Sequence, residues 1–117
     1  MKGKRGWGEA GEDYASLLLR KKGYIILQKN FRSKLGEIDI IAKEADTLVF
    51  VEVKTRWSRK YGFPEEAVNA YKLQKIKRVA EFYLLTHPTA PRKIRIDVVA
   101  IEVREGKVSS AKIITSV

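Results

Sequence analysis

The chain has 117 residues, 44% of them hydrophobic, and its 24 lysines and arginines outweigh 14 aspartates and glutamates to give a formal net charge of +10. This length and composition suit one core, so we expect residues 1–117 to form a single domain. The chain has no cysteine and only one histidine, His87, which excludes disulfides, thiolate zinc sites and histidine-rich metal sites. Any metal ion must therefore be bound by oxygen atoms, which favours Mg²⁺ or Mn²⁺.

The charge and hydropathy of the chain also limit its partners. The basic N-terminus is not followed by an apolar run of signal-peptide length, and no segment is long enough to cross a membrane, so we expect a soluble cytoplasmic protein with no membrane partner. A net charge of +10 favours a polyanionic partner, with nucleic acid first among them. The alternative is a basic surface that only keeps the protein soluble.

The first half of the chain predicts a helix and three strands. Residues 9–22 are predicted to be helical, residues 24–31 form a strand, and residues 36–42 and 47–56 form a hairpin around a turn at 43–46. The predicted apolar stripe of the helix consists of Ala10, Tyr14, Ala15, Leu17 and Leu18.

The second half predicts one longer helix and two strands. The helix begins at Pro64 or its neighbour and runs to about Thr86, with an apolar stripe at helical spacing. Residues 93–103 alternate as a strand, and a turn at 105–106 leads to a last strand over 108–114. The order α-β-β-β-α-β-β predicts an α/β fold with a mixed sheet flanked by helices.

Two acids and a lysine interrupt the apolar strands of the predicted hairpin. Asp39 lies within residues 38–41 and Glu52 within residues 49–53, and Lys54 shares a face with Glu52 because side chains two apart on a strand point the same way. Folding at the turn brings Asp39 roughly opposite Glu52. Burying a carboxylate is costly unless it is paired or binds a metal. Each acid alone could be a solvent-facing or ion-paired residue, but the three together favour a functional site.

This arrangement predicts metal-assisted hydrolysis of a phosphodiester. Asp39 and Glu52 would hold Mg²⁺ or Mn²⁺, and the carbonyl of Val53 is a candidate further ligand. The metal would lower the pKa of a bound water and offset charge in the transition state. Lys54 would orient or deprotonate that water, or stabilise the transition-state charge. Glu12, in the first helix, could point at the rim of this site, although the helix dipole also favours an acid there.

The spacing of Asp39, Glu52 and Lys54 resembles that of the PD-(D/E)xK nucleases, the superfamily of restriction endonucleases and Holliday junction resolvases, with Ile38 in place of the motif proline. More closely, the whole chain resembles the YraN family of small bacterial proteins, predicted endonucleases related to archaeal Holliday junction resolvases. The matching segments are Gly11-Glu12, 30–32, 36–41, 49–56, Lys72 and 95–99.

The resemblance implies a restriction-endonuclease-like fold, an α-β-β-β-α-β core to which this chain adds a C-terminal strand. It implies an active site at Asp39, Glu52 and Lys54, with Glu12 as a helix-borne acid near the metal. It also implies DNA as the partner, with branched or structured DNA as a candidate substrate. A homodimer is a candidate assembly, because junction resolvases match the two-fold symmetry of their substrate.

Basic and aromatic residues near the hairpin are candidate contacts to nucleic acid. The alternatives are that Trp57 covers the core and that the lysines of the second helix lie on an ordinary solvated face. The resemblance places Lys72 close to the site. The candidates are Arg32, Arg56, Trp57, Arg59, Lys60, Lys72 and Lys75.

The sequence therefore predicts a metal-dependent endonuclease that hydrolyses phosphodiester bonds in DNA. The alternative is a non-catalytic nucleic-acid-binding module, or an accessory subunit, on a nuclease scaffold. The two differ in whether turnover depends on a metal ion.

Overall fold

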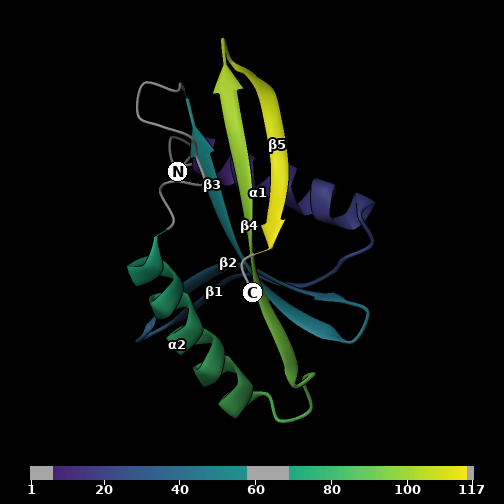
Figure 1. Ribbon diagram of the computed structural model, residues 1–117, viewed down its shortest axis with the longest axis vertical. Helices are drawn as coiled ribbons and strands as arrows, with labels where there is room; N and C mark the ends of the chain where they lie inside the picture. Colours follow the sequence, from purple (N-terminus) through teal and green to yellow (C-terminus); the bar gives the residue numbers. More distant parts are fainter. Residues whose placement is uncertain (1–6, 58–68, 116–117) are drawn as a thin grey trace.

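A five-stranded sheet with one helix packed on each face forms the protein, as the computed structural model shows for residues 7–57 and 69–115 (Figure 1). The strands follow their chain order across the sheet. Strands β3 and β4 pair in parallel, and the other neighbours pair antiparallel. Helix α2 lies in the crossover that a parallel pair requires. The elements are α1 (Trp7–Lys21), β1 (Ile25–Ser33), β2 (Gly36–Glu44), β3 (Thr47–Arg56), α2 (Ala70–Thr86), β4 (Lys93–Arg104) and β5 (Lys107–Thr115).

Each face of the sheet has its own apolar cluster, because the central strands β2, β3 and β4 are covered on both sides. Helix α1 contributes Ala15 and Leu19 to one cluster, and both side chains are fully buried. Helix α2 covers the other cluster, where the ring of Tyr83 meets Phe31 and Phe50 edge-on at centroid distances of 5.2 and 5.8 Å. Such edge-to-face pairs add to the free energy gained from burial. The two helices are therefore held rigidly against opposite faces of the same strands.

The buried face of α1 differs from the predicted stripe, which was wrong at three positions: Ala10, Tyr14 and Leu17 are all exposed. Tyr14 and Leu17 point outward with exposed fractions of 41% and 62%, whereas Gly11 and Ala15 face the sheet. A Cβ atom at Gly11 would lie 2.6 Å from Oγ1 of Thr55 on β3. The helix therefore approaches the sheet too closely for a larger residue, and the small side chains determine which face is buried.

Helix α2 begins later than predicted. Asn69 has an extended backbone and caps the helix, since its side-chain oxygen accepts a hydrogen bond of 3.0 Å from the backbone N–H of Lys72. The helix therefore starts at Ala70, and a continuous helix from Pro64 is ruled out by this cap. Pro64 itself lies outside the described residues.

The hairpin between β2 and β3 is tighter than predicted. Lys43 and Glu44 belong to β2, and Glu44 pairs with Thr47 across a turn of Ala45 and Asp46. Ala45 adopts a positive φ of 53°, as tight turns of this kind require. The short turn sets the register of the two strands, and with it the position of the acids further along them.

The predicted fold class is confirmed. The order of the elements and the mixed sheet flanked by two helices form the α-β-β-β-α-β core of the restriction-endonuclease-like fold, with β5 added at the sheet edge. The strands predicted over 24–31, 93–103 and 108–114 all form, within two residues at either end. Neither described helix is long and apolar enough to cross a membrane.

Candidate functional site

The site lies where β2 and β3 separate. Their paired register ends at Ile40 and Val51, so Asp39 and Glu52 are the next positions on the two strands. Oδ2 of Asp39 accepts a hydrogen bond of 2.8 Å from the backbone N–H of Val53. The Asp39 side chain thus satisfies the backbone N–H of Val53, which is left without a strand partner where β2 leaves β3. The two carboxylates lie in the space between the separating strands. The prediction that Asp39 lies roughly opposite Glu52 is confirmed.

Two cavities flank these carboxylates, and both are lined by Asp39 and Glu52. The first, of about 330 Å³, lies on the α2 side and is called the lysine cavity below; the second, of about 340 Å³, reaches the end of β3 and is called the tryptophan cavity. The lysine cavity is also lined by Gly36, Glu37, Lys72, Lys75, Ile76 and Val79. The tryptophan cavity is also lined by Glu12, Val53, Lys54, Thr55 and Trp57.

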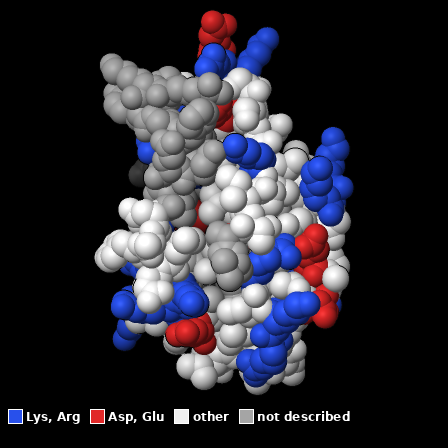
Figure 2. All heavy atoms as spheres, viewed as in Figure 1, with Lys and Arg blue, Asp and Glu red and all other residues white. Residues whose placement is uncertain are grey.

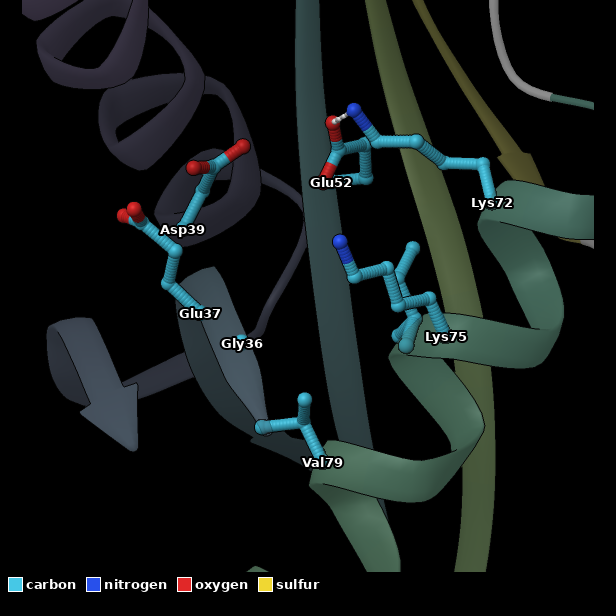
Figure 3. Close-up of a pocket in the computed structure, with 8 residues that line it drawn as sticks. Gly36, Glu37, Asp39, Glu52, Lys72, Lys75 and Val79 are labelled. Carbon is cyan, nitrogen blue, oxygen red and sulfur yellow. Dashed lines mark ion pairs between the residues drawn. The ribbon is translucent and has the colours of Figure 1, made fainter. Parts of the chain in front are cut away.

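An ion pair crosses the lysine cavity. Nζ of Lys72, in the first turn of α2, lies 3.3 Å from Oε2 of Glu52, and Figure 3 shows the two side chains meeting across the space between α2 and β3. The Glu52 side chain is 11% exposed and that of Lys72 is 42% exposed. Lys75, one turn further along α2, extends its amine toward the same space (Figure 3). The side of the site toward α2 is therefore cationic.

Burial raises the pKa values of the acids at the site, and the charge of Asp39 adds to this effect at Glu52 and Glu12. Burial raises the pKa of Glu52, and the charge of Asp39 raises it further, while Lys72 opposes both effects. Burial also raises the pKa of Asp39, with partial opposition from the hydrogen bond of Val53 and the charge of Lys72. Lys72, joined at Glu52 by Lys54, therefore offsets only part of the effect of burial on the pKa values of the two carboxylates.

Glu12 reaches the same carboxylates from α1. Burial raises the pKa of Glu12, and the charge of Asp39 and a hydrogen bond to it raise it further, whereas a hydrogen bond from Asn30 lowers it. The close contact of Gly11 with Thr55 brings this turn of α1 against β3. Glu12 therefore lies at the rim of the site, as predicted.

A buried acid elsewhere in the protein shows how this chain neutralises a structural carboxylate. Asp97 is fully buried, and its oxygens accept hydrogen bonds from the hydroxyl of Tyr24 at 2.7 Å and from Arg95 at 2.8 and 3.0 Å. Arg95 also bonds Glu44 at 2.6 Å. This network satisfies its charges internally. Asp39 instead accepts a hydrogen bond from the backbone N–H of Val53 and lines two cavities, so its environment suits an added cation.

The donor set at the site suits Mg²⁺ or Mn²⁺ better than a metal held entirely by protein. In the described part of the chain, no three His, Cys, Asp or Glu side chains are grouped to hold one ion. Asp39 and Glu52 supply carboxylate oxygens, and the Val53 backbone lines the same cavity. Mg²⁺ is usually bound by one or two carboxylates, with water and substrate phosphate completing its octahedral shell. The residues therefore fit this kind of ion.

The predicted contacts to nucleic acid fall into three groups. Lys72 and Lys75 line the lysine cavity, and Trp57 lines the tryptophan cavity with an exposed fraction of 56%. Arg32 and Arg56 line neither cavity. The side chain of Arg32 is 75% exposed and lies 3.8 Å from Glu37 across β1 and β2, and Arg56 is half-buried at the end of β3. Arg59 and Lys60 lie outside the described residues. Other lysines and arginines are spread over the face seen in Figure 2.

Sequence reasoning assigned no role to three residues at the site. Asn30 bonds Glu12, Glu37 lines the lysine cavity, and Thr55 lines the tryptophan cavity. Asn30 has a φ of 56°, a left-handed conformation that asparagine tolerates better than most residues. The preference of asparagine for this conformation and the charge of Glu37 are visible in the sequence. The distances of Asn30 and Glu37 from the carboxylates, however, are set by the packing of β1 and α1.

Comparison with known proteins matches the segment that contains these residues to one protein family. Residues 11–101 match the model described as "Uncharacterised protein family UPF0102". A UPF0102 protein of Caldicellulosiruptor saccharolyticus is 51% identical over 98 residues, covering 84% of this chain and 83% of that protein. Another from Persephonella marina is 47% identical over 94 residues, covering 80% and 81%. A third, from Dictyoglomus thermophilum, is 44% identical over 102 residues, covering 86% of each.

Proposed function

This chain belongs to the UPF0102 family, which is the YraN family, and we propose that it is a metal-dependent endonuclease that hydrolyses phosphodiester bonds in DNA. The observation that carries the proposal is the pair of carboxylates where β2 and β3 separate, that of Glu52 buried and that of Asp39 half-buried, flanked by Lys54 and by two cavities. The buried acid Asp97 is enclosed by its hydrogen-bond donors, whereas Asp39 and Glu52 both line two cavities that a metal ion and a substrate can enter.

The carboxylates of Asp39 and Glu52, with the Val53 carbonyl, would hold Mg²⁺ or Mn²⁺. When bound, such an ion acidifies a coordinated water and offsets the charge that develops on the phosphate. The hydrogen bond from Val53 fixes the Asp39 carboxylate in one orientation, so the ligand set is arranged before a metal arrives. Divalent charge would also relieve the repulsion that raises the pKa values of both acids.

The remaining residues of the site orient the substrate and the attacking water. Lys54 lines the tryptophan cavity beside both carboxylates, where its amine would orient the water or stabilise the negative charge of the transition state. Glu12 also lines that cavity, bonded to Asn30, and would accept a hydrogen bond from the same water. Lys72 and Lys75 would meet the backbone phosphates of DNA on the α2 side.

Cleavage of labelled DNA substrates tests the proposal. Four-way junction, flap, single-stranded and duplex DNA are incubated with Mg²⁺, with Mn²⁺ or with EDTA. We expect metal-dependent cuts from the wild-type protein and a loss of at least a hundredfold in rate from Glu52→Ala and from Lys54→Ala. Glu81→Ala, at an exposed position of α2 that lines neither cavity, is the matched control and retains full activity.

The alternative of a non-catalytic nucleic-acid-binding module makes the opposite prediction. It expects DNA binding that weakens with salt but no cleavage in any metal. Cleavage that persists in both Glu52→Ala and Lys54→Ala would also contradict the proposed active site, because it would have to arise elsewhere on the protein or from a contaminant. Circular dichroism of each variant establishes that it is folded before its rate is interpreted.

A further inference from the structure

The tryptophan cavity combines two features that hydrolysis of a phosphate does not require together. Charged residues line it, namely Glu12, Asp39, Glu52 and Lys54, and so does Trp57 with its large aromatic side chain. That side chain is 56% exposed at the end of β3. An aromatic ring beside a phosphate-binding position offers a flat surface of the size and chemistry of a nucleobase.

The lysine cavity differs from the tryptophan cavity in having a positively charged wall. It shares both carboxylates with the tryptophan cavity, and its charged wall on α2 is formed by Lys72 and Lys75. Figure 3 shows these two amines extended into one space from successive turns of the helix. Such a wall suits a backbone phosphate. A strand that lay across the carboxylates would therefore have lysines on one side and an indole ring on the other.

We infer that the tryptophan cavity is a stacking subsite for one unpaired nucleobase next to the scissile phosphate, with Trp57 as its platform. A base within continuous duplex is already stacked and paired, and it reaches a protein ring only if it leaves the helix. The substrate class would therefore be DNA with unpaired nucleotides at the cut, either single-stranded or branched. This inference rests on the proposed function, since the strand is placed by the active-site carboxylates.

The test uses binding rather than cleavage, so that it can fail separately from the proposed function. The probe is a 15-nucleotide DNA single strand with one 2-aminopurine, whose fluorescence is quenched by stacking. The comparison is the same strand annealed to its complement, in EDTA and at low salt. The variants are Trp57→Ala, which removes the ring, and Trp57→Phe, which keeps an aromatic face. The control is Tyr14→Ala, which removes another exposed ring from the outer face of α1.

We expect Trp57→Ala to weaken single-strand binding by roughly tenfold, within the range found when a stacking aromatic is replaced by alanine. Duplex binding should change by less than about twofold, because phosphate contacts dominate it. Trp57→Phe should retain most of the affinity and the fluorescence change, and Tyr14→Ala should retain both. Equal losses on single-strand and duplex DNA, or no loss on either, would overturn the inference.

Parallel cleavage assays with Mg²⁺ separate the two ideas. Metal-dependent cleavage with the same single-strand-to-duplex rate ratio in wild type and Trp57→Ala would refute the stacking subsite and leave the endonuclease proposal intact. Base stacking that depends on Trp57, without any metal-dependent cleavage, would refute the endonuclease proposal and support the subsite as part of a binding module.

Discussion

Replacement of Asp39 by asparagine should stabilise the metal-free protein while abolishing its response to metal. The substitution keeps the shape of the side chain, and its amide oxygen can still accept the hydrogen bond of 2.8 Å from Val53. It removes a negative charge that raises the pKa of both Glu52 and Glu12. The native state therefore loses electrostatic repulsion and retains the contact that joins β2 to β3.

The size of the effect follows from the position of these groups. Two like charges about 4 Å apart repel by up to about 4 kcal/mol at an effective dielectric constant of 20. Asp39 is half-buried and opens onto two cavities, and Lys72 already offsets part of the charge, so about 1 kcal/mol is a reasonable gain in the free energy of unfolding. For a domain of this size that corresponds to an increase in Tm of about 4 °C.

The raised pKa values of these acids, caused first by burial and then by like charge, predict how stability depends on pH. The pKa values of Asp39 and Glu52 lie above their ordinary values of 3.8 and 4.5 in the folded protein. The native state therefore binds more protons than the unfolded state in the window above those values. Stability of the metal-free wild-type protein should fall as the pH rises through this window, and the fall should be smaller in Asp39→Asn.

Thermal unfolding followed by circular dichroism measures these effects, in EDTA and with Mn²⁺, at pH 5 and pH 8. Mn²⁺ should raise the Tm of the wild-type protein at pH 8 and leave that of Asp39→Asn unchanged, so that the order of stability reverses. Glu81→Gln, an exposed acid on α2, should behave as wild type. A lower Tm for Asp39→Asn in EDTA, or equal stabilisation of both proteins by Mn²⁺, would refute the reasoning.

Two further substitutions test the supports of the site. Lys72→Met should lower stability in EDTA by about 1 kcal/mol, because Glu52 loses its ion pair of 3.3 Å. It should also tighten Mn²⁺ binding by about fivefold in calorimetry, because the metal no longer competes with a cation. Lys75→Met is the control, and equal Mn²⁺ affinities of Lys72→Met and the wild-type protein would contradict the idea. Gly11→Ala should lower stability by about 1–2 kcal/mol in urea titration, because its Cβ would lie 2.6 Å from Oγ1 of Thr55. Adding Thr55→Ala should recover most of that loss, and failure to do so would show that the contact is not responsible.

The hairpin and its acids were predictable because they depend on local rules. Alternation with a period of two places Glu52 and Lys54 on one face, and the turn between the strands brings Asp39 opposite Glu52. The short apolar runs on either side identify both strands. The predicted turn at 43–46 is centred one residue before the true two-residue turn at Ala45 and Asp46. This difference shifts the pairing of the strands by two residues, which keeps Asp39 and Glu52 on the same face.

The buried face of α1 was not predictable from hydrophobicity. Tyr14 and Leu17 are larger and more apolar than Gly11, yet they lie outside, because the helix gains more from close contact with β3 than from burying large side chains. The ion pair between Lys72 and Glu52 also escapes local rules. A lysine on a helix 20 residues beyond Glu52 reaches it only through the crossover that returns the chain to β4.

The α/β class, the hairpin, and the two acids and the lysine on its strands are readable from the amino-acid order, since each follows from periodicity, turn chemistry and the cost of burying charge. The surroundings of these residues depend on packing in the folded chain: Glu12 comes from α1, Lys72 comes from α2, and cavities of unlike character lie on either side of the carboxylates. These contacts join residues far apart in the chain, and their geometry depends on how closely each helix packs on the sheet.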